Sequence, residues 1–267
     1  MIRGMRRVRA GGTDIAVHVQ GEGPALLFVH GFPFDHALWR HQLKTFPGWW
    51  RLAPDLRGVG SSGVPTEGYS MARYADDLVD VLDALDVAAA VVCGLSMGGY
   101  VLFELLRRHL PRVRAAILCD TRAEADTEEG RRGRDEMIAL ARSGGAGAVA
   151  DRMLPTLLAA DTRAERPEVE GQVREMIERT PVVGLVGALQ AMRDRVDSTP
   201  LLADLRLPVL VLAGASDGIT TPESGLALAE KIKGARFATV AGAGHLPPLE
   251  QPFVTTRLIA DFLKTVF

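Results

Sequence analysis

The stretch that decides the fold reads Val92-Cys93-Gly94-Leu95-Ser96-Met97-Gly98-Gly99. It places the pattern Gly-x-Ser-x-Gly between an apolar run, residues 90–93, and a segment with helical periodicity, residues 100–110. A sharp turn from strand to helix holds such a serine in a strained conformation and projects its hydroxyl above a sheet, and the glycines avoid clashes across the turn. The helix that follows points its N-terminus at the serine, where it favours developing negative charge. We therefore predict that Ser96 is a nucleophile.

A serine hydroxyl is a weak nucleophile unless a base accepts its proton, so a histidine must reach Ser96. The chain contains His18, His30, His36, His41, His109 and His245. Of these, His245 follows the last apolar run and precedes the final helical segment. A loop at the C-terminal edge of a parallel sheet is where ligands bind in open α/β folds. We predict that His245 is the general base and that the other histidines are structural, with His30 supporting its own loop.

The carboxylate that orients the imidazole should lie between the two in the chain order Ser…Asp…His. Asp217 fits this order and follows the apolar run of residues 209–213. Asp120 is the alternative, because it ends the earlier run of residues 115–119. Its structural interpretation is a cap ahead of the next segment. We favour Asp217 as the acid.

Acyl transfer also requires backbone donors for the oxyanion, and removing one such donor typically costs about 3 kcal/mol. The amide of Met97, the residue after the nucleophile, is one predicted donor. The second should come from the loop His30-Gly31-Phe32-Pro33, which follows an apolar run. We assign it to Phe32, because Pro33 has no N–H group.

Short apolar runs alternate along the chain with amphipathic helical patterns. The runs cover residues 17–19, 25–29, 51–53, 90–93, 115–119, 209–213 and 237–240, and the helical patterns cover 74–85, 100–110, 224–232 and 254–266. Several runs are almost continuously apolar, which is typical of strands covered on both faces in a parallel sheet. The alternation predicts βαβ units with right-handed crossovers.

Residues 121–200 differ from the rest, because they are rich in arginine and glutamate and contain no convincing strand. We predict a helical cap here, inserted into a core formed by residues 1–120 and 201–267. Extra crossover helices are the alternative, but some eighty residues far exceed an ordinary connection. Phe34 and Trp39, with the Met and Leu residues of the cap, are candidate substrate-binding residues that would fit an ordinary core equally well.

The composition points to a protein that acts on small molecules. The chain has 267 residues, 47% of them hydrophobic, and a formal net charge of −2, which gives no electrostatic reason to bind nucleic acid or an anionic membrane. Its two cysteines, Cys93 and Cys119, lie in apolar stretches and do not suggest a disulfide-built secreted protein. The basic start lacks the apolar region of a signal peptide, and no run approaches the roughly 18 residues of a membrane span. We expect a cytoplasmic protein, and the sequence leaves its oligomeric state open.

Together these features resemble the α/β-hydrolase superfamily over nearly the whole chain. The resemblance is carried by residues 30–33, Asp55-Leu56-Arg57-Gly58-Val59-Gly60-Ser61-Ser62, the Ser96 turn, Asp217 and the His245 loop. It implies an α/β-hydrolase fold, with a mostly parallel twisted sheet, flanking helices and a helical cap. It also implies that Arg57 forms an internal ion pair or hydrogen bond and is not a catalyst. The cap resembles that of 3-oxoadipate enol-lactonases and related carboxylesterases at residues 139–145 and 184–189, whereas residues 30–33 are more similar to general esterases.

The function that these residues predict is hydrolysis of small carboxylic esters through an acyl-enzyme. Ser96 attacks the carbonyl, His245 accepts its proton and later protonates the leaving alcohol, and Asp217 holds the imidazole. No metal or organic cofactor is required. A lactonase of the 3-oxoadipate enol-lactonase type is the main alternative, and a perhydrolase or a non-catalytic ligand receptor are weaker ones. Epoxide hydrolases and haloalkane dehalogenases of this fold use an aspartate where this chain has Ser96.

Overall fold

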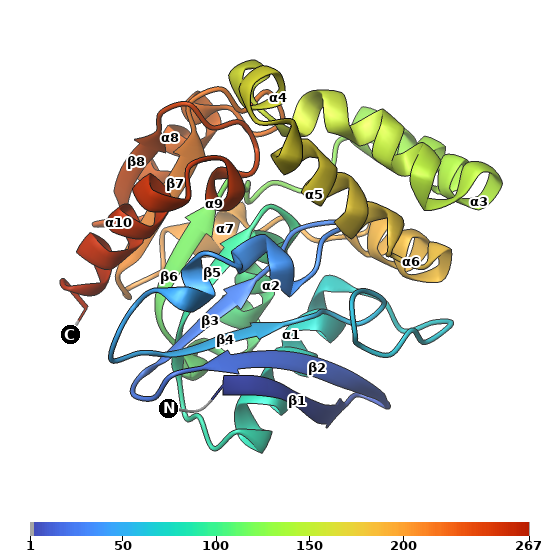
Figure 1. Ribbon diagram of the computed structural model, residues 1–267. Coiled ribbons are helices and arrows are strands. Elements are labelled where there is room, and N and C mark those ends of the chain that lie inside the picture. Colours follow the sequence, from blue (N-terminus) through green and yellow to red (C-terminus); the bar gives the residue numbers. More distant parts are fainter. Residues whose placement is uncertain (1–2, 267) are drawn as a thin grey trace.

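The computed structural model describes residues 3–266 and is built around one sheet (Figure 1). Its strands are β1 (Arg3–Ala10), β2 (Thr13–Gln20), β3 (Ala25–Val29), β4 (Trp50–Pro54), β5 (Ala90–Leu95), β6 (Val113–Cys119), β7 (Val209–Gly214) and β8 (Arg236–Val240). They lie in the order β1-β2-β4-β3-β5-β6-β7-β8. β2 runs antiparallel to both of its neighbours, and all the other pairs are parallel. The predicted mostly parallel sheet is confirmed.

All seven apolar runs lie in strands, and β5 and β7 are buried at every position. Burial on both faces is what makes these strands continuously apolar. β1 was not predicted. In the described part of the chain it is an edge strand that pairs with β2 alone. From Gly4 onward its residues are exposed except for Val8 and Ala10, so the strand can form from an arginine-rich sequence.

Helices flank the sheet and join its strands. They are α1 (Met71–Ala84), α2 (Met97–Arg108), α8 (Pro222–Glu230), α9 (Pro247–Glu250) and α10 (Pro252–Leu263), with short 3₁₀ helices η1 (His36–Trp39), η2 (Gln42–Lys44) and η3 (Leu110–Arg112). The four predicted helical segments correspond to α1, α2, α8 and α10, with starts two or three residues earlier than predicted. Within residues 3–266, no helix is both long and apolar enough to cross a bilayer.

The segment between β6 and β7 is helical. It contains α3 (Glu128–Leu157), α4 (Ala160–Glu165), α5 (Pro167–Glu178), α6 (Val182–Arg193) and α7 (Thr199–Leu202), and none of residues 121–200 is in a strand. α3 packs against α5 and α6 and is kinked at Gly145, where φ is +71°. In Figure 1, α3 to α6 form one group on a single side of the sheet, at the top of the view. The division of the chain into a core and a cap stays a prediction.

Candidate active site

Ser96 lies at the turn between β5 and α2, with φ +53° and ψ −114°. A positive φ is unfavourable for a residue with a side chain, so neighbouring contacts must hold the turn in place. Those contacts are close: a Cβ on Gly94 would lie 2.4 Å from the carbonyl oxygen of Gly98, and a Cβ on Gly98 would lie 2.3 Å from that of Val29. Both glycines of the pattern are therefore required by backbone approach.

The structure brings the three residues of the predicted triad together. His245, on the loop after β8, has Nε2 3.0 Å from Oγ of Ser96. Its Nδ1 lies 2.7 Å from Oδ2 of Asp217, which follows β7. Both His245 and Asp217 are 3% exposed, so water does not compete for these hydrogen bonds. The arrangement can carry a proton from the serine hydroxyl to the imidazole.

Asp217 is surrounded by hydrogen-bond donors. Its Oδ1 accepts from the amides of Ile219 and Thr220 at 2.7 and 3.2 Å, and its Oδ2 accepts from the Thr220 hydroxyl at 2.6 Å. Burial alone would raise the pKa of Asp217. The hydrogen bond from His245, its positive charge and the donors just named outweigh burial, and they lower the pKa of Asp217 to about 2. An ionised Asp217 accepts from a protonated Nδ1, which leaves the Nε2 lone pair facing Ser96.

Asp120, the alternative acid, lies close to this pair but is held differently. Its Oδ1 accepts from the amide of Gly214 at 2.7 Å. One carboxylate oxygen of Asp120 lies within 4.8 Å of a carboxylate oxygen of Asp217 and of a ring nitrogen of His245. Among the described residues, however, His245 makes its hydrogen bonds to Asp217 and Ser96 and none to Asp120. Burial, with the charge of Asp217, raises the pKa of Asp120 well above its ordinary value. A raised pKa disfavours the negative charge that an imidazolium needs, which makes Asp120 the weaker candidate for the acid.

A buried glutamate that the sequence did not reveal fixes the His245 loop. Glu250, in α9, is fully buried, and its Oε1 accepts from the amides of Gly244 and Leu246 at 2.9 and 3.0 Å. Its Oε2 accepts from the amide of Ala159 at 2.7 Å. The carboxylate thus ties both neighbours of His245 to the start of α4. A glutamate near a helix start is common, so the sequence signal was weak.

Two threonines complete the support of the site and were also missed. The Thr121 hydroxyl donates to the carbonyl oxygen of Ser96 at 2.8 Å. The Thr220 hydroxyl, besides its bond to Asp217, lies 3.3 Å from Nδ1 of His245. Thr121 directly follows Asp120 and Thr220 lies three residues after Asp217, so proximity to a strand-end aspartate was the only signal for them.

The predicted oxyanion donors are the amides of Met97, which directly follows Ser96, and of Phe32, which lies in the loop after β3. A Cβ on Gly31 would lie 3.2 Å from Cβ of Ser96, so the loop after β3 packs directly against the nucleophile. Phe32 follows Gly31 and lines the cavity over Ser96. Met97 opens α2, where backbone amides have no partner within the helix. Their role as donors stays a prediction.

His30 and Arg57 hold the loops beneath the site. His30 donates from Nδ1 to the Gly31 carbonyl at 2.9 Å and accepts at Nε2 from the Leu56 amide at 3.0 Å. Burial lowers the pKa of His30, which keeps it neutral in this role. Arg57 makes a buried bidentate pair with Asp77, at 2.6 and 2.7 Å. The structural roles predicted for both residues are confirmed.

Ser96 and His245 open into a cavity of about 310 Å³. Much of its apolar wall comes from residues 121–200, through Met137, Met153, Leu157, Leu189 and Met192. Phe34 and Trp39, by contrast, are fully buried and are not among the lining residues. Trp39 packs on Phe28 with ring centroids 5.0 Å apart. The structure therefore places Phe34 and Trp39 in the core, because an apolar side chain after a strand can face either way.

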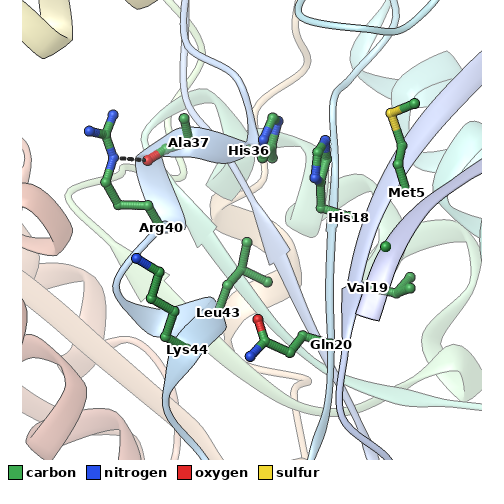
Figure 2. A pocket seen from close by; sticks show the side chains of 10 residues that line it. Met5, His18, Val19, Gln20, His36, Ala37, Arg40, Leu43 and Lys44 are labelled. Atoms are coloured by element: carbon green, nitrogen blue, oxygen red, sulfur yellow. Dashed lines mark hydrogen bonds between the residues drawn. The ribbon is translucent and has the colours of Figure 1, made fainter. Parts of the chain in front are cut away.

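A second hollow, of about 410 Å³, lies between β1, β2, η1 and η2 (Figure 2). Its ten lining residues include no serine, cysteine or acid, so a Ser-His-Asp or Cys-His arrangement is absent from it. The rings of His18 and His36 are stacked 3.3 Å apart, and Nδ1 of His36 binds Asp55 at 2.7 Å. The lone pair of an imidazole nitrogen lies in the plane of its ring, so two parallel stacked rings do not direct their lone pairs to one point. The group of His18, His36 and Asp55 therefore does not fit a metal ion.

Residues 24–252 match the family model described as the alpha/beta hydrolase fold. The chain belongs to this family.

Proteins similar to this α/β hydrolase include enol-lactonases and an esterase. It is 27% identical to 3-oxoadipate enol-lactonase 1 of Acinetobacter baylyi, over 96% of this chain and 95% of that protein. A thermophilic esterase from Thermogutta terrifontis superposes with a TM-score of 0.95 at 37% identity, covering 98% of this chain and 99% of the other. The enol-lactonase from Burkholderia xenovorans LB400 gives 0.90 at 29% identity, covering 97% and 100%. These likenesses support a hydrolase.

Proposed function

We propose that this α/β hydrolase is a serine hydrolase that cleaves small carboxylic esters through an acyl-enzyme intermediate. The observation that carries the proposal is the chain of two hydrogen bonds, 3.0 Å from Ser96 Oγ to His245 Nε2 and 2.7 Å from His245 Nδ1 to Asp217. A nucleophile bonded to a base, with the base oriented by a third group, is the signature of nucleophilic catalysis.

The reaction begins when Ser96 Oγ attacks the ester carbonyl and His245 accepts its proton. Asp217 stabilises the imidazolium that forms. The amides of Phe32 and Met97 bind the oxyanion, each with a contribution of about 3 kcal/mol. His245 then protonates the leaving alcohol as the tetrahedral intermediate collapses to the acyl-enzyme. In the second half, His245 deprotonates a water molecule that attacks the acyl carbonyl, and the acid product leaves with Ser96 regenerated.

Residues 121–200 are proposed to act as a cap on the core formed by residues 1–120 and 201–267. Eight of the fifteen residues that line the cavity come from α3 and α6, which supports this division. A cavity of about 310 Å³ lies at the lower end of the range for small-molecule sites, so substrates of modest size are expected.

Cys93 and Cys119 are both free and buried, which supports the proposed cytoplasmic location.

A lactonase is the second candidate. A lactone is a cyclic ester, so the same residues open it by the same steps, with the leaving alcohol remaining attached to the acyl group. The similarity to two named enol-lactonases favours this candidate. Rates on p-nitrophenyl esters of increasing chain length, measured beside a panel of lactones, would separate the two activities.

The proposal is tested by Ser96→Ala, which removes the nucleophile. We expect ester turnover to fall by about 10³-fold or more while the melting temperature stays unchanged. Ser143→Ala is the matched control, because Ser143 is exposed on α3 and should keep full activity. A Ser96→Ala enzyme that keeps more than roughly a tenth of the wild-type rate would reject the proposal.

A further inference from the structure

An arginine in the wall of the active-site cavity makes no ion pair with an acid among residues 3–266. Arg122 follows β6 and lines the cavity, and its Nη2 donates to the carbonyl oxygen of Ile219. Its Nε is buried and has no hydrogen-bond partner. A buried donor without a partner is destabilising, so a ligand that supplies an acceptor to this guanidinium is favoured.

The rest of the wall does not neutralise this charge. Asp126 is the one acid among the fifteen residues that line the cavity. Its carboxylate is already shared by two arginines, at 3.0 Å from Nε of Arg134 and 2.7 Å from Nη1 of Arg195. Arg122 therefore leaves the cavity with an excess of positive charge, against a largely apolar wall.

Arg122 is anchored at the edge of the triad. The hydroxyl of its neighbour Thr121 donates to the Ser96 carbonyl at 2.8 Å. The carbonyl oxygen of Ile219 accepts the hydrogen bond from Arg122, and the amide of Ile219 donates to Oδ1 of Asp217 at 2.7 Å. Arg122 and Ser96 line the same cavity, whose volume is only about 310 Å³. An anionic group bound to Arg122 and a carbonyl group placed at Ser96 would therefore be two parts of one small molecule.

We propose that the substrate carries a carboxylate, which Arg122 binds while Ser96 attacks the ester carbonyl. The class comprises monoesters of short dicarboxylic acids, esters of hydroxy acids and lactones that bear a carboxylate. A guanidinium presents a planar fork of donors to a carboxylate, and charge-assisted bonds of this kind are among the stronger hydrogen bonds in proteins. The inference rests on the proposed function, because it names the substrate of that same site.

Two matched pairs of substrates test this inference. Monoethyl succinate and ethyl succinamate differ only in an acyl-side carboxylate or carboxamide, and O-acetylglycolate and O-acetylglycolamide differ in the same way on the alcohol side. Hydrolysis is followed in a pH-stat. We expect kcat/KM for the carboxylate to exceed that for the amide by roughly tenfold or more in at least one pair.

Arg122→Gln should abolish this preference. Relative to its effect on the amide substrate, it lowers kcat/KM for the preferred carboxylate substrate by a further factor of roughly 10 to 100, mainly through KM. Arg132→Gln is the matched control, because it removes the same charge from an exposed position on α3 and should change neither substrate.

Two results would overturn the inference while leaving ester hydrolysis intact. One is equal rates within both pairs for the wild-type enzyme. The other is a loss in Arg122→Gln that is equal for both members of a pair, which would show that Arg122 only anchors Ile219. If the wild-type enzyme hydrolyses none of these substrates and no p-nitrophenyl ester, the proposed function itself fails and the inference fails with it.

Discussion

Asp217→Asn removes the charge that faces His245 while keeping the shape of the side chain. The carboxylate receives four hydrogen bonds, from Nδ1 of His245, the Thr220 hydroxyl, and the amides of Ile219 and Thr220. An asparagine has one acceptor oxygen, so the imidazole faces an N–H donor or loses its partner and turns to the other tautomer. The corresponding change in a Ser-His-Asp protease lowers kcat about 10⁴-fold, and we expect a loss of about 10³- to 10⁴-fold here.

Asp120→Asn is the matched control for this change. Burial and the charge of Asp217 raise the pKa of Asp120, and an asparagine oxygen can still accept from the Gly214 amide. We expect its kcat to stay within about tenfold of wild type. The assay is kcat and KM for p-nitrophenyl acetate, with thermal melts to show that both variants fold. If Asp120→Asn proves as damaging as Asp217→Asn or more so, the assignment of the acid is refuted.

Two further predictions concern stability. Glu250→Gln can keep at most two of the three backbone hydrogen bonds to Glu250, so we expect urea unfolding to show a loss of about 2–4 kcal/mol together with lower kcat. A loss below about 1 kcal/mol would contradict this role. Lowering the pKa of Asp217 from 3.8 to about 2 stabilises the fold by about 2 kcal/mol above roughly pH 4, and this contribution is lost as pH falls towards 2. The stability gap between wild type and Asp217→Asn should shrink over that range, and a constant gap would argue against it.

Most of the sheet could be predicted from the sequence because its central strands are buried on both faces. β5 and β7 are apolar at nearly every position, and such runs have few other structural uses. β1 (Arg3–Ala10) was not predicted because it has no apolar run: an edge strand needs only a backbone partner, and from Gly4 onward most of its residues are exposed. The segment of residues 121–200 could be recognised as helical, but how its helices pack depends on contacts between distant residues.

The residues of the site also differ in how far the sequence alone could identify them. Ser96, Asp217 and His245 could be selected because each follows a strand, and the parallel order of the sheet gathers such positions at one edge. Glu250 and Arg122 could not, because their significance lies in partners about 90 or more residues away, the Ala159 amide and the Ile219 carbonyl. A lone glutamate or arginine in a sequence carries no sign of such a partner.

The activation of Ser96 by His245 is tested most directly by labelling with an active-site-directed fluorophosphonate, followed by intact mass and peptide mapping. We predict one adduct per chain, located on the peptide that contains Ser96. The adduct should be absent from Ser96→Ala and should form far more slowly on a folded His245→Ala variant. A folded wild-type protein that takes up no label, or takes it up on another residue, would contradict the assignment.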